Sequence, residues 1–338
     1  HVEYANRNPI KRVWHIMESI KAHLRFLKLS VRLKPTIIIG IDSGGLVLAR
    51  ILQRYINVFH KQKAVLDYLS FEIFFKDEGA NKNKEVEASS HIRNLIIQDS
   101  VRDNLLRKEN YIADKVKSFY IPVSPLIQAN QNNEKQETFL TIRERYNLKE
   151  DTKLIVSFGS FDSWTGAQWI ISAVEKGLPE NMVFVIHSRN KFDESNPLHQ
   201  KVIELSATNK QIILSEFYIK NQQTAISFLK QFDAGLVFYI SSGSIYTGKN
   251  IYHIGNSSGK FSFYMAAHLP VIANNLPTYK ALNADYKFGY IVEDENEFFN
   301  LIKQNPDFTL LKENCRKAYN EVLDPSKALD NYVDSLII

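Results

Sequence analysis

The sequence predicts an α/β protein made of two Rossmann-like domains, each with a parallel sheet, that face a cleft. Short β-rich runs alternate with helical stretches along the chain, which is typical of parallel strands joined by crossover helices. A length of 338 residues with 44% hydrophobic residues is sufficient for two buried cores. The polar segment 128–138 is the best linker. It separates an N-terminal domain at 1–127 from a C-terminal domain at 139–320, and residues 321–338 are expected to form a C-terminal helix.

Ten strands are expected in the β-rich runs, with helices between most of them. In chain order they lie at 36–40, 64–69, 95–98, 118–121, 154–158, 182–186, 212–214, 234–239, 270–273 and 290–292. Ligands of open parallel sheets bind at the carboxyl ends of the strands. The residues expected on that side of the cleft are Asp42, Ser70, Glu72, Gly159, His187 and Gly255.

The most informative stretch is NSSGKFSFYMAAHLPVIAN, residues 256–274, in which a turn of small residues leads into a helix and then a buried strand. Ser257, Ser258 and Gly259 leave room for an anion, and Lys260 adds a positive charge. The helix, expected to start near Phe261, points its positive dipole end at the same place. These features predict a diphosphate site. The alternative is an ordinary helix capped by Ser257 or Ser258, and the turn alone does not choose between the two.

Residues 264–272, YMAAHLPVI, resemble the YMAAGLPVI run of nucleotide-sugar glycosyltransferases with the GT-B fold (the family 4-like, group 1 superfamily). The resemblance extends over most of the chain, specifically in the second half and more loosely in the first. The segments that carry it are 153–173, 181–188, 211–218, 232–239 and 289–293 on the donor side, and 35–49 and 67–72 on the acceptor side.

The resemblance implies metal-independent transfer of a sugar from a nucleotide-sugar donor to a carbohydrate or glycolipid acceptor, without a cofactor. By analogy with most such enzymes, the donor is expected to be a UDP-sugar. No cluster of His, Asp and Glu at ligand spacing argues for a metal.

The resemblance also implies that the helix at 321–338 returns to the first domain, and it implies the site residues. The donor phosphates are expected at Lys260 and the amides of 257–259, together with Gly159 and Arg189; for Arg189 the alternative is a surface arginine. Stacking on the base is expected from Phe217 or Tyr218, one of which can instead pack in the core, and Tyr239 is placed with them at the base and ribose.

The catalytic candidates are Asp42, after the 37–39 strand run, and Glu72, at the end of the second strand. For Asp42 the alternative is capping of the helix through 44–49, and for Glu72 it is a solvated carboxylate. His187 and His268 are further candidates; His268 replaces the glycine of the motif and is expected to pack at the helix end. His91 is expected to cap or stabilise a helix.

The chain departs from the family pattern at several places. Many retaining relatives carry two acidic residues where this chain has Gly255 and Phe263, and Ser160 and Thr165 lie near the places of an arginine and a lysine that often clamp the phosphates. The strand and glycine turn that normally open the acceptor domain are also not found. Either the sequence starts after them, or this domain is small.

Two other classes of function therefore remain open. A nucleotide-sugar-binding protein with a regulatory or scaffolding role is supported by Phe263 and Gly255. A nucleotide-sugar epimerase with the same fold would need several acidic residues and histidines in the cleft, which the sequence does not reveal.

Charge is concentrated at the N-terminus. The first 34 residues hold eight Lys/Arg and two Glu, a net charge of +6 against +5 for the whole chain. An apolar stripe runs beside them at helical spacing, through Trp14, Met17, Ile20, Leu24, Leu27 and Val31. This helix either packs on a sheet or binds an anionic membrane surface, where a glycolipid acceptor would be found. Nucleic acid is not an expected partner, because aromatic and basic residues do not interleave.

Cys315 is the single cysteine, so an internal disulfide is excluded, and it is expected to be an incidental helix residue rather than a catalytic thiol. No apolar run is long enough to span a bilayer, and no secretory leader is recognised. These features favour a cytoplasmic protein, either free or peripheral at the inner membrane face.

Overall fold

The computed structural model describes residues 32–75, 82–127, 140–188, 190–215, 217–241 and 248–337, with a few isolated residues between 17 and 28. The chain divides into two compact units. The first comprises residues 1–97 and 104–119 together with Ile338, and the second comprises residues 98–103 and 120–337. The predicted linker 128–138, Arg189 and most of the basic N-terminal segment lie outside the described residues.

The first unit is built on a four-stranded sheet of order β1-β2-β3-β4. β1 pairs with β2, and β2 with β3, in parallel. Its core gathers apolar side chains of the strands, of α3 and of α5, among them Ile38, Leu46, Leu66, Leu95 and Leu106. The elements in chain order are β1 (Ile37–Ile41), α3 (Asp42–Phe59), β2 (Val65–Leu69), α4 (Lys82–Ser89), β3 (Asn94–Ile97), α5 (Ser100–Asn110) and β4 (Lys117–Tyr120).

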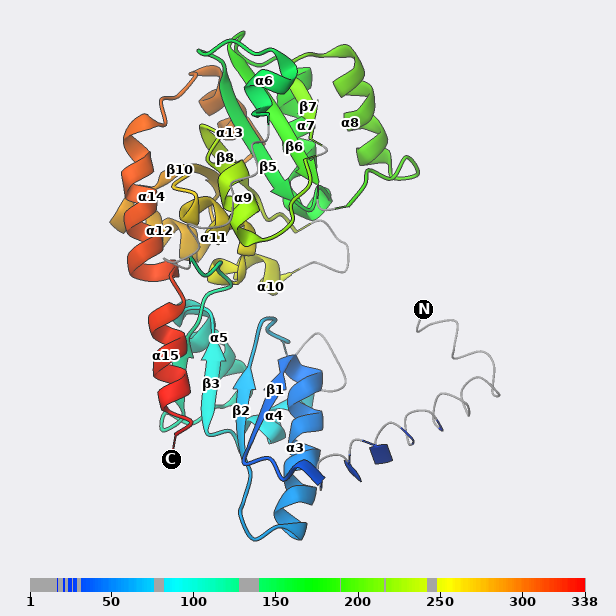
Figure 1. Cartoon of the computed structure of the whole chain (residues 1–338), viewed down its shortest axis with the longest axis vertical. Helices are drawn as coiled ribbons and strands as arrows, with labels where there is room; N and C mark the ends of the chain where they lie inside the picture. Colours follow the sequence, from blue (N-terminus) through cyan, green and yellow to red (C-terminus); the bar gives the residue numbers. More distant parts are fainter. Residues whose placement is uncertain are drawn as a thin grey trace. The chain divides into compact units, whose positions relative to one another are not determined.

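The second unit is built on a six-stranded parallel sheet of order β10-β9-β8-β5-β6-β7 (Figure 1). Its strands are β5 (Lys153–Gly159), β6 (Met182–Ser188), β7 (Ile212–Leu214), β8 (Ala234–Val237), β9 (Val271–Asn274) and β10 (Gly289–Val292). The first half of the unit adds α6 (Ile142–Tyr146), the short 3₁₀ turn η1 (Ser163–Thr165), α7 (Ala167–Glu175), α8 (Pro197–Thr208) and α9 (Gln222–Leu229). The second half adds α10 (Lys249–Tyr252), the 3₁₀ turn η2 (Gly255–Ser257), α11 (Gly259–Ala266), α12 (Pro277–Tyr286), α13 (Glu295–Lys303), the 3₁₀ turn η3 (Thr309–Leu311), α14 (Lys312–Ala318), the π-helical turn η4 (Tyr319–Leu323) and α15 (Ser326–Asp334).

All ten predicted strands are found, and their bounds differ from the predictions by two residues at most. The prediction of two parallel-sheet α/β domains is therefore confirmed. The expected return of the C-terminal helix to the first domain stays a prediction.

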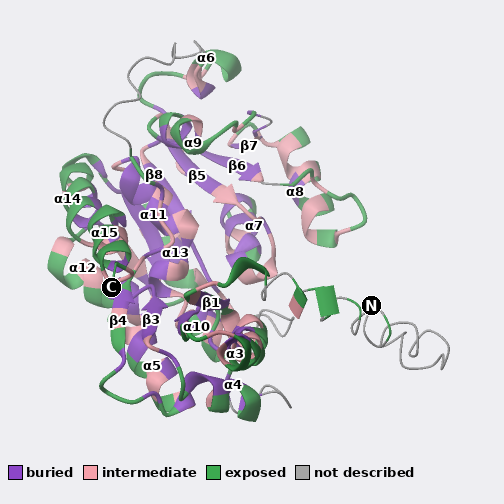
Figure 2. Cartoon of the chain, turned by 60° about the horizontal axis from the view of Figure 1, so that its bottom comes forward, coloured by how far each residue is buried: buried purple, intermediate pink, exposed green. Residues whose placement is uncertain are grey.

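The six-stranded sheet is buried on both faces because successive side chains of a strand point to opposite sides. In β5, Leu154 and Val156 belong to one apolar cluster and Ile155 to the other. Residues of α9, α11 and α14 cover the first face, and residues of α7 and α13 cover the second. The strands β5, β6 and β8 are accordingly buried along most of their length, whereas α8 and α14 carry exposed residues (Figure 2).

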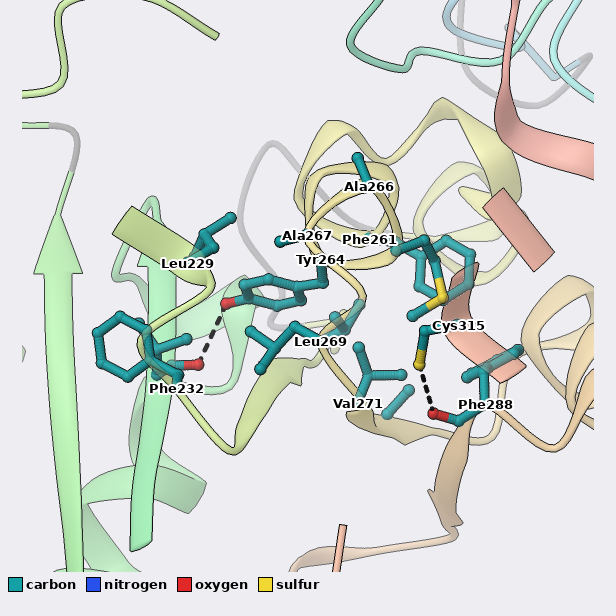
Figure 3. Packing of buried hydrophobic residues seen from close by; sticks show 14 of the residues in the cluster. Leu229, Phe232, Phe261, Tyr264, Ala266, Ala267, Leu269, Val271, Phe288 and Cys315 are labelled. Atoms are coloured by element: carbon teal, nitrogen blue, oxygen red, sulfur yellow. Dashed lines mark hydrogen bonds between the residues drawn. The ribbon is translucent and has the colours of Figure 1, made fainter. Parts of the chain in front are cut away.

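Tyr264 of α11 inserts its ring between the helix and the sheet. Its hydroxyl donates to Val156 O at 3.1 Å and accepts from Phe158 N at 2.9 Å, so it bonds two backbone groups of β5. The ring fits because residue 235 is glycine: a Cβ there would lie 2.6 Å from the nearest ring carbons. One buried side chain thus fixes α11 against the carboxyl end of β5 (Figure 3).

Cys315 is also part of this core. It is fully buried, its thiol donates to Phe288 O at 3.3 Å, and burial raises its pKa far above the ordinary range for a thiol (Figure 3). A protonated buried thiol is a packing group rather than a nucleophile. No helix in the described part of the chain is both long and apolar enough to cross a membrane.

We expect Tyr264→Phe to lower the free energy of unfolding by about 1–3 kcal/mol, because Val156 O and Phe158 N would lose a buried partner. Urea denaturation monitored by circular dichroism measures the change. Tyr252→Phe is the matched control, since Tyr252 is 52% exposed. Equal stability of the two variants would contradict the anchoring role of the Tyr264 hydroxyl.

Candidate functional site

The candidate site lies where the strand order of the second sheet reverses. From β5 the chain continues to β6 and β7 on one side, and then crosses to β8, β9 and β10 on the other. Ligands of open parallel sheets bind at the carboxyl ends of the strands beside such a switch point. Gly159 ends β5 there, and Tyr239 follows β8 by two residues.

The turn before α11 is held by its own hydrogen bonds. Ser258 is the N-cap, and its hydroxyl accepts from Phe261 N at 3.1 Å, so the capping interpretation of Ser258 is confirmed. Ser257 N donates to Ile254 O at 2.9 Å, and Ser258 N donates to Gly255 O at 3.2 Å. These two amides, which the sequence assigned to phosphate, are therefore already used. The N–H groups that an α-helix leaves without an intrahelical acceptor here are those of Gly259 and Lys260.

The ammonium of Lys260 is buried without a hydrogen-bonding partner in the described structure. The residue as a whole is partly accessible, whereas the Nζ atom is buried. The side chain reaches the end of β5, since a Cβ on Gly159 would lie 3.8 Å from Lys260 Cε. Burial lowers the pKa of Lys260 to about 8. An unpaired buried cation is unfavourable in the folded protein, and an anion bound beside it would remove that penalty.

Aromatic rings form a wall at the end of β5. Phe158 stacks on His187 with ring centroids 5.3 Å apart, and Phe263 lies 6.3 Å from Phe158. His187 Nδ1 is 3.3 Å from Ser215 Oγ, and burial lowers the pKa of this histidine, which keeps the ring neutral. Phe263, at a place where many relatives have an acidic residue, therefore adds to an apolar wall.

Gly255 occupies the second place at which many members of the family that the sequence resembles have an acidic residue. The geometry of the turn explains why this residue is a glycine. Its φ is +46°, and a Cβ there would lie 2.4 Å from Asp99 Oδ2 and 2.7 Å from Thr278 Oγ1. The Asp99 carboxylate accepts from Asn256 N at 3.0 Å and from Arg102 N at 2.9 Å. A carboxylate from a distant part of the sequence thus braces the turn and fills the space beside Gly255.

Arg102 strengthens this brace: it is buried, and it donates to His253 O at 2.7 Å. The sequence analysis did not select Asp99 or Arg102. The signal that could have found Asp99 is its position directly after the β3 run, where a polar residue at a strand end is a ligand or capping candidate.

The three base and ribose candidates lie in different environments. Phe217 is buried and stacks on Phe228 at 4.9 Å, so it is the member of the pair that packs in the core. Tyr218 is 77% exposed. Tyr239 is buried, its hydroxyl is 2.6 Å from Ser258 Oγ, and burial raises its pKa to about 12. Tyr218 is thus the candidate whose ring is accessible to a base, whereas Tyr239 supports the cap of α11.

In the first unit, the structure brings the two catalytic candidates together. Asp42 Oδ1 accepts from Phe71 N at 2.7 Å and from Glu72 N at 2.9 Å. The helix-capping alternative for Asp42 is wrong: Asp42 is the first residue of α3, with φ of +52°, and no side chain caps that helix. Asp42 instead holds the loop after β2, and the carboxylate of Glu72 is exposed.

The other predicted residues have local roles or lie outside the described ranges. His91 Nε2 is 3.4 Å from Glu87 Oε1, four residues earlier, near the end of α4. Of the apolar stripe in the basic segment, Met17 and Leu24 are exposed, so the packed alternative is not supported for these two residues. In the described ranges no three His, Cys, Asp or Glu side chains gather as ligands for a metal ion.

Several solved structures have a fold similar to that of this chain. HepE of Anabaena in complex with UDP aligns with 93% of this chain and 81% of its own, at a TM-score of 0.69 and 12% identity. Sucrose-phosphate synthase from Thermosynechococcus elongatus aligns with 94% of this chain and 77% of its own, at a TM-score of 0.64 and 12% identity. A trehalose 6-phosphate synthase from Burkholderia multivorans aligns with 97% of this chain and 77% of its own, at a TM-score of 0.66 and 12% identity.

These similarities show that the chain has the GT-B fold, as the sequence resemblance predicted. No protein-family model matches the chain. No curated protein matches it either.

We expect Lys260→Met to raise the free energy of unfolding at pH 7, by up to about 3 kcal/mol, because the variant removes a buried unpaired charge. The folded-state pKa of Lys260 lies below the unfolded value, so the penalty is complete below about pH 8. The penalty disappears as the pH rises to about 10.5, which is the pKa of a lysine in the unfolded chain. Urea denaturation at pH 7 and pH 10 measures the difference. If Lys260→Met raised the free energy of unfolding equally at pH 7 and at pH 10, the burial of a charged ammonium would be contradicted.

Proposed function

We propose that this protein is a glycosyltransferase that moves a sugar from a nucleotide-sugar donor, a UDP-sugar, to a carbohydrate or glycolipid acceptor without a metal ion. The observation that carries the proposal is the buried, unpaired ammonium of Lys260 at the start of α11, beside the switch point of the sheet. HepE, which has the same fold, is described in complex with UDP and with UDP-glucose. The trehalose-phosphate synthase of Burkholderia vietnamiensis is described as UDP-forming.

The reaction needs a site that stabilises the departing nucleoside diphosphate. When the bond between the sugar and the diphosphate breaks, negative charge accumulates on the leaving oxygen. Lys260 and the N–H groups of Gly259 and Lys260 are fixed positive groups, so they stabilise that charge with little reorganisation. The apolar wall of Phe158 and Phe263 lowers the local dielectric constant, which strengthens the attraction. Tyr218 is the proposed stacking residue for the base.

The acceptor hydroxyl must lose a proton, and the first unit offers two carboxylates for this step. Oδ1 of Asp42 accepts hydrogen bonds from the N–H groups of Phe71 and Glu72, in the loop after β2. Asp42 is therefore a positioning residue. Glu72, the residue whose backbone Asp42 holds, is exposed and is the proposed general base. Gly255 and Phe263 lie at the two places where many members of the family that the sequence resembles carry an acidic residue. A protein that binds nucleotide sugars for regulation, without transfer, is therefore the second candidate.

A peripheral position at the cytoplasmic membrane face, where a glycolipid acceptor would be reached, belongs to the same proposal. Its support is the charge of +6 in the first 34 residues.

We expect UDP to bind the wild-type protein and Lys260→Met to weaken that binding by about 10- to 100-fold, because a charge-assisted contact is lost. Isothermal titration calorimetry measures the dissociation constant. Lys280→Met, at an exposed lysine of α12, is the matched control and should bind as the wild type does.

The same titration has a pH signature. The wild-type affinity should fall as the pH rises through about 8, where the ammonium of Lys260 loses its proton, and Lys260→Met should lack that decrease. Wild-type affinity in Lys260→Met, or no UDP binding by the wild type, would refute the donor site.

We expect Glu72→Gln to lower kcat by about 100-fold or more while the affinity for UDP stays unchanged, because it removes a general base. Asp42→Asn should lower kcat less, since its amide oxygen still accepts the two N–H groups. Release of UDP from UDP-glucose, with and without sugar acceptors, is the assay, and Asp114→Asn, at an exposed residue of the first unit, is the control. UDP binding by the wild type with no release of UDP from any donor would favour the non-catalytic candidate.

A further inference from the structure

A cavity of about 390 Å³ lies at the C-terminal end of α11, whereas the donor turn lies at the N-terminal end of the same helix. Its floor is apolar and consists of Phe232, Ala267 and Leu269, which belong to the core cluster seen in Figure 3. Its rim is charged or titratable and consists of Lys230, His268, Lys312 and Glu313. The cavity therefore combines a hydrophobic surface with a ring of mostly basic groups.

The carboxylate on the rim, that of Glu313, is already paired with an arginine. Glu313 forms a bidentate pair with Arg316, with Arg316 Nε 2.8 Å from Glu313 Oε2. Within the described ranges, Lys230 at the end of α9 and Lys312 at the start of α14 have no ion-pair partner. The two lysines are thus free to bind an external anion.

His268 stands on the rim in a backbone conformation that favours glycine. Its φ is +57°, its N–H donates to Met265 O at 2.9 Å, and Leu269 N donates to Tyr264 O at 2.9 Å. These two bonds are the Schellman ending of a helix, in which the position of His268 is usually glycine. The backbone is less favourable there for a residue that has a Cβ, and strained backbone positions are found at functional sites.

The electrostatic surroundings of His268 are also unfavourable for a proton. Burial lowers the pKa of His268, and Lys230 and Arg316 lower it further, while Glu313 acts in the opposite direction. The charged groups that face the imidazole therefore come from the end of α9 and from α14. An anion bound beside Lys230 would offset these effects and favour protonation of His268.

We propose that this cavity is a binding site for an organic phosphate, whose phosphoryl group lies between Lys230, Lys312 and His268 and whose apolar part lies on Phe232, Ala267 and Leu269. Three basic groups around one cavity suit a dianion better than a single carboxylate, because a phosphomonoester carries close to two charges and three acceptor oxygens at neutral pH. The apolar floor selects a phosphate that carries a hydrocarbon or ring. The site is independent of the proposed donor site, which uses the other end of α11.

The test is calorimetric titration of the full chain with phenyl phosphate and with inorganic phosphate. The titrations use the Lys260→Met background, so that the donor turn does not contribute. Phenyl phosphate should bind more tightly than inorganic phosphate, and Lys230→Met and Lys312→Met should each weaken it by about tenfold or more. Lys280→Met, at an exposed lysine of α12, is the matched control and should not change the affinity.

His268→Gly separates binding from folding. Because glycine relieves the strained conformation, this variant should melt at the wild-type temperature or above, and it should bind phenyl phosphate more weakly. No binding of phenyl phosphate at millimolar concentration overturns the proposal, and so does unchanged binding by the two lysine variants and by His268→Gly. Equal affinities for phenyl and inorganic phosphate overturn the assignment of the apolar floor.

Vesicles distinguish the two sources of such a phosphate. Sedimentation with vesicles of phosphatidylcholine that contain phosphatidic acid is compared for the wild type and the double variant Lys230→Met/Lys312→Met. A decrease in the double variant supports a lipid headgroup as the ligand. Equal sedimentation of the two proteins, with phenyl phosphate bound by the wild type only, supports a soluble organic phosphate.

Discussion

The hydroxyl of Tyr264 is the contact on which the candidate site depends. β5 and β8 pair only through Ile155 and Val156, and beyond them the hydroxyl of Tyr264 bonds the backbone of β5 at Val156 and Phe158. A side chain from α11 thus takes the place of the neighbouring strand. The two strands separate at their carboxyl ends as a result, and α11 is fixed so that Lys260 reaches Gly159. The separation of the strands and the position of the Lys260 side chain therefore depend on the same contact.

Around that contact, the turn before α11 is rigid. Tyr239 bonds the N-cap Ser258, Asp99 accepts from Asn256 N, and Val123 N donates to Asn256 O at 2.9 Å. Three segments that lie far apart in the sequence therefore hold two residues of the turn, Asn256 and Ser258. Rigid donors need little reorganisation when they meet an anion. By contrast, the Lys260 ammonium is buried without a hydrogen-bonding partner in the described structure, so it is a positive charge of the turn that no protein group satisfies.

The sequence was sufficient for the strands and for the turn, but not for the contacts between distant segments. β-rich runs and small-residue turns are local signals, and they located all ten strands and the start of α11. The bonds of Asp99 with Asn256 and of Asp42 with Glu72 join residues 157 and 30 positions apart, which no local pattern encodes. Local alternation also could not decide which of Phe217 and Tyr218 is buried, because that depends on Phe228 across the fold.

Residues at the two ends of α11 help to distinguish a protein that binds ligands from one that has kept only the fold. Lys260 is a buried charge without a partner, and His268 occupies a conformation suited to glycine. Each feature lowers stability, and a single substitution, to an apolar residue or to glycine, would remove each cost. Features that are costly to stability and easily removed are typical of functional sites. These two features are the structural support for the two proposed ligand sites of α11. Glycine at 255 and phenylalanine at 263 do not weaken this argument, because the φ of +46° at Gly255 suits a glycine and Phe263 packs against the core cluster.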